Sequence, residues 1–215
     1  MTATAEPQSA LVEESAPTTR CRILAAAERF FREIGYQKTT VADIAKSLGM
    51  SPANVYRFFD SKRSINEAVV ARVTQEVQAQ IEAAAVMPGL TAAERLAAII
   101  ETLHACCVER CKENPRIHEM VEAAMSDSWD VCRAHVERIS AVLAGVVREG
   151  VRDGEFTVED PDEAGRCLYL ATTRYTHPVL VSQGWMMPDP DVTVMTRFLL
   201  RGLGFRERTT QGFAA

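Results

Sequence analysis

Between Thr40 and Lys62 the chain carries side chains whose polar groups suit hydrogen bonding to DNA. The amide of Asn54 matches the donor and acceptor that adenine presents in the major groove. The guanidinium of Arg57 matches guanine or a phosphate oxygen, and Ala53 offers a methyl group to thymine. These residue types favour direct contacts to bases and phosphates.

Two hydroxyl residues stand where short helices are expected to begin. Thr40 and Ser51 each place a hydroxyl beside the free backbone amides of a helix start, a setting that suits a phosphate oxygen. Pro52 then occupies the first helical position, where its missing N–H costs nothing. These DNA contacts require two short helices that are held at a fixed position relative to each other.

The local pattern predicts those two helices and a tight turn between them. Thr40 and Asp43 are spaced as a capping box, and Gly49 stands where a left-handed helix end favours glycine. Val55 and Phe59, four residues apart, are expected to point inward. The side chains left facing outward are Ala53, Asn54, Arg57 and Phe58. The arrangement indicates a helix-turn-helix, whose second helix lies in the DNA major groove. An ordinary helical hairpin in an all-helical core is the alternative.

Charge is distributed unevenly along the chain. Residues 18–63 hold nine Lys and Arg against four Asp and Glu, a net charge of +5. The whole chain has a net charge of −5, so all other residues together carry −10. A basic segment on an acidic remainder is expected when one module meets phosphate and the other does not. This asymmetry favours DNA binding over the hairpin.

The stretch from about Arg22 to Val70 resembles the tetracycline-repressor (TetR) family of bacterial transcription regulators, over about a quarter of the chain. The matching pieces are Phe30-Phe31, Gly35-Tyr36, Thr39-Thr40, Ile44-Ala45, Gly49-Met50-Ser51, Val55-Tyr56-Arg57, Phe59 and Ser61-Lys62. The resemblance implies sequence-specific DNA binding by a transcriptional regulator.

The resemblance also implies roles for three further residues. Tyr56 matches the family's phosphate-binding tyrosine, and Lys62 matches its backbone-binding lysine at the start of the fourth helix. Phe58 departs from the pattern, since the family often has His or Tyr there. A phenylalanine donates no hydrogen bond, so an apolar base contact replaces a phosphate contact in this expectation. A tyrosine buried in the core is the alternative for Tyr56.

Composition places the chain among ordinary globular proteins. It has 215 residues, of which 47% are hydrophobic and 25% charged. No apolar run suits a membrane span and no signal-peptide core is present, so we expect a cytoplasmic protein with no membrane partner. The small, polar and acidic residues 1–17 predict a disordered arm. The six cysteines lack a framework spacing and are expected to be reduced, buried thiols.

Helical periodicity extends over the rest of the chain and predicts an all-α fold with no strand. We expect a helix-turn-helix domain at 18–63, a linking helix at 61–86 and a helical ligand-binding and dimerisation domain at 64–206. Asp189-Pro190 should cap the last helix, and Met125 should point inward. The resemblance implies a homodimer in which 161–182 and 190–204 form a four-helix bundle with the partner, mirroring a palindromic operator.

A repressor of this type requires a signal, and the abundant Met, Leu and Val predict a small hydrophobic effector. Polar or aromatic residues on otherwise apolar faces are the candidate pocket residues, although each alone also fits a satisfied core or surface position. They are His104, His118, Trp129, Tyr169, Arg174, Tyr175 and His177. No cofactor is expected.

Alternatives of other kinds remain at this point. His104, Cys107 and Cys111 share one helical face with His118 nearby in sequence, so a zinc sensor or a thiol-based redox sensor is conceivable. Cysteine also behaves as a small hydrophobe in a core. A ligand-free DNA-organising protein of the same fold is a further alternative, favoured by lack of an apolar pocket. No phosphate loop, nucleophile elbow or paired-carboxylate site favours an enzyme.

Overall fold

The structure is a computed structural model that describes residues 18–127, 129–182 and 190–205. Over these ranges the chain forms helices only, which confirms the all-α prediction. The helices are α1 (Thr19–Glu33), α2 (Val41–Ser47), α3 (Pro52–Tyr56), α4 (Lys62–Ala85), α5 (Ala92–Glu113), α6 (Ile117–Asp127), α7 (Trp129–Arg152), α8 (Pro161–Thr176), α9 (Pro178–Ser182) and α10 (Val192–Gly202).

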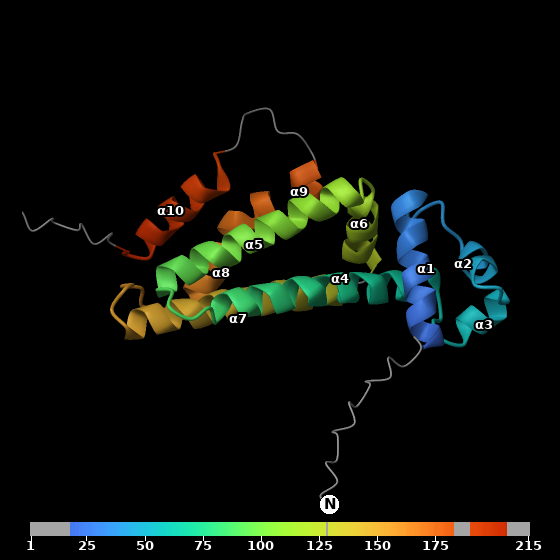
Figure 1. The fold of residues 1–215 in the computed structure, drawn as a ribbon, viewed down its shortest axis with the longest axis horizontal. Coiled ribbons are helices and arrows are strands. Elements are labelled where there is room, and N and C mark those ends of the chain that lie inside the picture. Colours follow the sequence, from blue (N-terminus) through green and yellow to red (C-terminus); the bar gives the residue numbers. More distant parts are fainter. Residues whose placement is uncertain (1–17, 128, 183–189, 206–215) are drawn as a thin grey trace, which may run out of the picture.

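The helices are arranged along an elongated molecule. Figure 1 shows α1, α2 and α3 gathered at one end, where they form what we call the N-terminal module. The long helix α4 runs from this module into the body, beside α5 and α7. Helix α4 is therefore the structural link between the two parts.

Two apolar cores divide the molecule, and α4 contributes to both. The first core joins α1, α2 and α3 to the beginning of α4, around fully buried Phe31, Ile44 and Ile65. Helix α6 adds Met120 to this core. The second core joins the end of α4 to α5, α7 and α8. Burial of α6 against the N-terminal module connects the body directly to that module.

Helix starts in the N-terminal module follow the predicted capping pattern. Thr40 and Asp43 form a reciprocal capping box at α2, and Ser51 accepts a hydrogen bond from the amide of Asn54 at α3. Gly49 has a φ of 67°, the left-handed conformation that a glycine adopts without strain. These local bonds set the turn between α2 and α3.

Helices α7 and α8 approach each other closely at Gly165. A Cβ atom at this position would lie 2.6 Å from the carbonyl oxygen of Ser140 and 2.7 Å from the Cβ of Ala144. Only glycine allows the two backbones to meet at this distance, because any side chain would collide with backbone atoms.

Two details of the body differ from the sequence prediction. Asp191, not Asp189, caps the last helix, since its carboxylate accepts from the amide of Thr193. Met125 is not part of a buried core, since it is 38% exposed, but it is one of the side chains that line the cavity of the body. The predicted arm at 1–17 lies outside the described residues.

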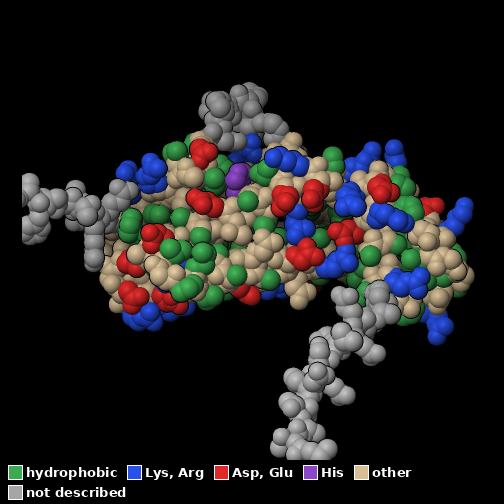
Figure 2. Space-filling view, in the orientation of Figure 1, with side chains coloured by type: hydrophobic (Ala, Val, Ile, Leu, Met, Phe, Trp, Pro, Cys, Tyr) green, Lys and Arg blue, Asp and Glu red, His purple; other side chains and the backbone are tan. Residues whose placement is uncertain are grey.

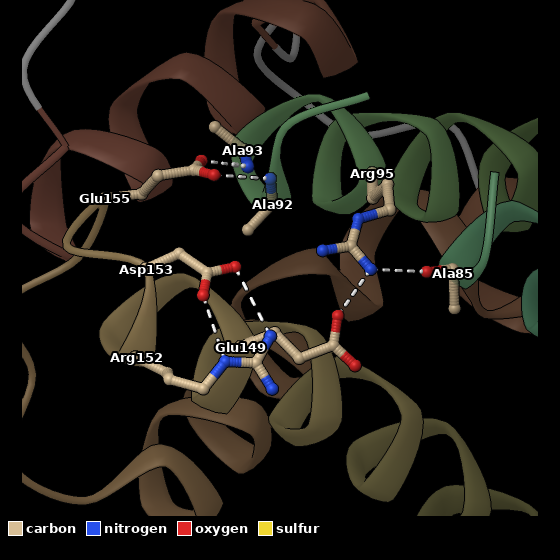
Figure 3. Close-up of polar contacts among 8 residues, drawn as sticks. All are labelled: Ala85, Ala92, Ala93, Arg95, Glu149, Arg152, Asp153 and Glu155. Atoms are coloured by element: carbon tan, nitrogen blue, oxygen red, sulfur yellow. Dashed lines mark hydrogen bonds and ion pairs between the residues drawn. The ribbon is translucent and has the colours of Figure 1, made fainter. Parts of the chain in front are cut away.

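Polar contacts join several helices at the end of the body farthest from the N-terminal module (Figures 1 and 3). The carboxylate of Glu155 accepts from the amides of Ala92 and Ala93, which begin α5 (3.0 and 3.1 Å). Arg95 donates to the Ala85 carbonyl at the end of α4 and to Glu149 of α7 (2.9 and 2.6 Å). These bonds satisfy helix ends and stabilise this end of the body.

Within the residues that the structure describes, no helix combines the length and apolarity required to cross a lipid bilayer.

Candidate DNA-binding surface and effector cavity

The predicted base-reading and phosphate-contacting residues gather on the outer face of α3. Val55 and Phe59 are buried beneath the helix, as predicted. Tyr56 and Phe58 are 49% and 41% exposed, so the alternative of a core tyrosine does not apply. The other exposed positions of this face are Ser51, Pro52, Ala53 and Arg57. The structure thus brings six predicted contact residues onto one solvent-facing surface.

Asn54 lies at the edge of this surface and is half-buried. The nitrogen of its side-chain amide is 3.9 Å from the sulfur of Met50, a weak contact that keeps this side chain close to the turn between α2 and α3. Ser51 only accepts a hydrogen bond, from the Asn54 amide at 3.3 Å, so its hydroxyl hydrogen remains available for an acceptor such as phosphate.

Thr40 is exposed, but its hydroxyl hydrogen is already used. The hydroxyl donates to Asp43 Oδ2 at 2.6 Å and accepts from the Asp43 amide at 3.1 Å. Hydrogen bonds from the Thr40 hydroxyl and amide lower the pKa of the Asp43 carboxyl below its usual range. The Thr40 hydroxyl therefore serves as the N-cap of α2.

Lys62 is engaged inside the N-terminal module rather than projecting from it. Its ammonium donates to the carbonyls of Tyr36, Gln37 and Thr39 at 2.9, 3.3 and 3.1 Å, and lies 4.4 Å from the ring centroid of Tyr36. Burial lowers the pKa of this ammonium. An ammonium has three hydrogens, so all its donors are used between α1 and α2.

Positive charge surrounds the end of the molecule that carries α3. Figure 2 shows Lys and Arg side chains distributed over this end, whereas Asp and Glu side chains gather on the body. Exposed cations of the module include Arg29, Lys38, Lys46 and Arg63. The charge asymmetry of the sequence is thus also a spatial asymmetry, with the positive surface around the candidate base-reading face.

A cavity of about 820 Å³ lies between the helices of the body. Most of its wall is apolar, with side chains from α4 to α9, for example Val73, Leu103 and Val136. Glu28 and Arg32 of α1 complete the wall, so the cavity borders the N-terminal module. Its size falls within the range of small-molecule sites in proteins.

Two of the predicted pocket residues, Tyr169 and His177, line this cavity. Four others, His104, His118, Arg174 and Tyr175, are not part of its wall. Nδ1 of His104 donates to the Tyr175 carbonyl at 2.9 Å, and Arg174 donates to the carbonyl of Leu180. The side chain of Trp129 lies outside the described residues.

His135 lines the cavity and was not among the predicted residues. It lies on α7 four residues before buried Ile139 and four after Val131, so it interrupts the apolar stripe of that helix. A polar residue within an apolar helical stripe was the sequence feature from which His135 could have been predicted as a cavity residue. Burial, together with the charge of Arg138 and of His177, lowers the pKa of His135 to about 4.

The cysteines are free thiols, as expected, but Cys21 and Cys167 are exposed rather than buried. Cys106 and Cys107 are buried, and burial raises the pKa of both thiols, most strongly that of Cys107. Since the thiolate is the reactive form, this environment disfavours thiol chemistry. Among the described residues no three His, Cys, Asp or Glu side chains are grouped as metal ligands, and His104 is bonded elsewhere.

Comparison with known proteins agrees with this geometry. The description "Bacterial regulatory proteins, tetR family" matches residues 23–69, and "Tetracyclin repressor-like, C-terminal domain" matches residues 92–193. The chain is 27% identical over 160 residues to the probable HTH-type transcriptional regulator ArpR of Pseudomonas putida, covering 68% of this chain and 74% of ArpR.

Two solved structures share the fold. One is the complex of SmeT with triclosan (TM-score 0.65, 21% identity, 88% of this chain and 92% of that chain). The other is FadR from Bacillus subtilis in complex with stearoyl-CoA (TM-score 0.62, 20% identity, 85% of this chain and 96% of that chain).

A helix-turn-helix module on an all-helical body defines a DNA-binding transcriptional regulator. Both matched regions lie in one family, and together they cover the module and most of the body. The chain belongs to the TetR family.

Proposed function

We propose that this protein is a homodimeric repressor that leaves a palindromic operator when a small apolar effector fills the cavity. The observation that carries the proposal is the composition of the cavity wall. Glu28 and Arg32 of α1 face the same space as Val77 of α4 and Leu103 of α5. An occupant therefore contacts the body and the N-terminal module together, and its binding depends on their relative position.

The DNA contacts follow from the exposed face of α3. We propose that Asn54 and Arg57 read base edges, with Ala53 and Phe58 in apolar contact, while Ser51 and Tyr56 bind phosphates. Pro52 begins the helix at the same surface. Thr40 and Lys62 hold the backbone around α2 in position, which differs from the phosphate contacts expected from the sequence.

Helix α6 offers a route between effector and DNA. Arg116, just before α6, donates to the Ile34 carbonyl at the end of α1 (3.0 Å), and buried Asn66 of α4 donates to the Met120 carbonyl (3.1 Å). Ile117 and Met120 also line the cavity. An occupant that displaces α6 thus acts on α1 and α4, and depletes the DNA-competent conformer in proportion to its differential affinity.

A homodimer accounts for apolar side chains exposed on the last helices. Phe198 and Val194 of α10 are 71% and 50% exposed, and Leu170 of α8 is 68% exposed. Apolar groups gathered on neighbouring helices mark an interaction surface. A two-fold dimer through α8 and α10 would present two copies of α3 to successive major grooves, roughly 34–36 Å apart.

The division into domains and the location complete the proposal. We assign residues 18–63 to DNA binding and 64–206 to effector binding and dimerisation, with 61–86 as the link. A regulator of bacterial operators acts in the cytoplasm. The apolar cavity favours this effector-controlled function over a ligand-free DNA-organising protein.

The decisive experiment for DNA binding is an electrophoretic titration with the DNA immediately upstream of the protein's own gene. We expect a discrete complex that a scrambled sequence of equal length does not compete away. Small apolar compounds are then screened for release of that complex. Equal affinity for scrambled DNA would contradict sequence-specific regulation.

The dimer has a separate test by sedimentation of Phe198→Glu. A charge in the proposed interface should shift the protein toward monomer at micromolar concentration. Val86→Glu is the matched control. Val86 is 75% exposed but caps the end of α4, and so belongs to neither of the helices α8 and α10 that form the proposed interface. Dissociation by both variants, or by neither, would count against the α8–α10 interface.

A further inference from the structure

Two imidazoles with unused hydrogen-bonding capacity stand in the wall of the effector cavity. His135 extends from the middle of α7, and His177 follows the last residue of α8. Both line the same cavity, and His177 contributes to the lowered pKa of His135. Among the described residues neither Nδ1 atom has a hydrogen-bond partner, although both atoms are buried.

The position of His177 is set by its backbone. Its extended conformation (φ −100°, ψ 123°) is the one favoured before a proline, here Pro178. Its amide donates to the Thr173 carbonyl and its carbonyl accepts from the Val181 amide, at 3.0 and 2.9 Å. The ring therefore stands at a defined break between α8 and α9, beside the cavity.

Several other polar groups of the wall are already occupied. The hydroxyls of Thr74, Thr173 and Thr176 donate to carbonyls of their own helices, at 3.0, 2.9 and 3.2 Å. Two of the arginines are paired with carboxylates, Arg110 with Glu76 and Arg133 with Glu137. The imidazoles differ from these neighbours because no hydrogen bond among the described residues uses their ring nitrogens. Since both Nδ1 atoms are buried, an occupant would meet the Nε2 atoms.

The two rings are uncharged near neutral pH. Burial lowers the pKa of His177, and burial with the nearby Arg138 and His177 lowers that of His135 to about 4. An anion between uncharged imidazoles would lose its hydration without gaining a counter-ion. A neutral imidazole has one donor and one acceptor nitrogen, so a hydroxyl can accept from one ring and donate to the other.

Building on the proposed effector pocket, we propose that His135 and His177 together hold the polar end of an uncharged, largely apolar effector that carries a hydroxyl group. The apolar wall receives the remainder of the molecule. Because the rings come from α7 and from the α8–α9 junction, the hydroxyl bridges two elements that no hydrogen bond between these side chains joins in the free protein.

Matched probes test the chemical class. Calorimetric titration at pH 7.5 compares biphenyl, 4-phenylphenol and biphenyl-4-carboxylate, and then decane, 1-decanol and decanoate, so that only the polar end changes within each set. We expect the hydroxyl compound of at least one set to bind about tenfold more tightly than its hydrocarbon and its carboxylate, the effect of a satisfied buried hydrogen bond.

Variants assign that preference to the two rings. In His135→Phe and His177→Phe the hydroxyl compound should lose its advantage while the hydrocarbon still binds. His118→Phe, which replaces a histidine outside the cavity wall, should keep it. The comparison is made within each protein, so a general loss of stability does not alter it.

The outcomes separate this inference from the proposed function. Tightest binding of the carboxylates, or a hydroxyl preference that persists in both cavity variants, would overturn the role of the histidines while leaving an apolar effector pocket. Absence of binding by every probe to the wild-type protein would overturn the effector pocket and this inference together.

Discussion

The outer face of α3 and the wall of the cavity both present polar groups to a ligand, but in opposite environments. On α3 these groups are exposed, so water satisfies them before DNA arrives. In the cavity the Nδ1 atoms of His135 and His177 are buried and unpaired. A buried unpaired polar atom costs about 1–3 kcal/mol, whereas an exposed one costs nothing comparable.

The difference implies two kinds of selectivity. The α3 surface gains affinity mainly from the positive charge around it, which attracts any nucleic acid, and gains specificity from a few base contacts. In our proposal the cavity gains affinity from apolar burial, and specificity from hydrogen bonds between the occupant and the two imidazoles. The DNA site should therefore respond to salt, and the cavity to the chemical match of its occupant.

The largest difference between the two sites should be in how their binding affinities depend on salt concentration. A dimer that neutralises about six phosphates should lose roughly a thousandfold in operator affinity between 50 and 200 mM salt. Binding of 4-phenylphenol in the cavity should change by less than about twofold, because no counterions are released. Fluorescence anisotropy and calorimetry over this range provide the two slopes, and parallel slopes would contradict the distinction.

Lower pH should reduce the free energy of unfolding through the cavity residue His135. The lowered pKa of His135, about 4, means that the unfolded chain takes up its proton first as pH falls below 6.5. This contribution to folding is therefore complete above pH 6.5 and is lost as pH falls toward 4, by about 3 kcal/mol at most. Urea unfolding at pH 7.5 and pH 5 should show a smaller loss in His135→Phe than in wild type. An identical loss in the two proteins would show that the pKa of His135 is not lowered in the folded state.

Lys62 distinguishes structural cations from DNA-binding ones. Lys62→Met should lower the free energy of unfolding by about 2 kcal/mol, because three carbonyls lose their charged donor. Lys46→Met, at an exposed site on α2, should change it by less than about 0.5 kcal/mol. The salt slope of DNA binding should persist in Lys62→Met. A decreased slope in Lys62→Met would return this residue to the phosphate contacts.

Asn54 tests base reading on α3. Asn54→Ala should cost about 1–2 kcal/mol at one base pair of each half-site and leave binding to scrambled DNA intact. Titration against single-base operator variants provides the measurement. A uniform loss on all sequences would instead assign Asn54 a structural role at the start of α3, where its side-chain amide contacts the sulfur of Met50.

The cysteines should produce the smallest effects. Cys107→Ala should cost about 1 kcal/mol through lost volume, without altering operator binding or its release. Because burial raises the pKa of the Cys107 thiol, iodoacetamide at pH 7.5 should modify exposed Cys21 and Cys167 first. Peptide mass mapping shows the order. Early modification of Cys107, or release of DNA by peroxide in wild type only, would favour the thiol sensor.

Much of the fold followed from local sequence signals. The capping box of Thr40 and Asp43, the left-handed Gly49 and the inward pair Val55 and Phe59 all concern residues within four positions of each other. Hydrogen bonds and steric limits over such short separations depend little on the rest of the chain. The helices and the exposed face of α3 were therefore predictable.

The roles of individual polar side chains depended on packing between distant segments. Lys62 donates to the Tyr36 carbonyl across 26 residues, an internal bond that no local sequence pattern predicts. His135 and His177 line one cavity because α7 packs against α8. The sequence by itself determined the helices, the charge asymmetry and the DNA-facing surface, since these arise from neighbouring residues. The tertiary structure alone decided which polar groups are satisfied and which face the cavity, because partners far apart in sequence are chosen by packing.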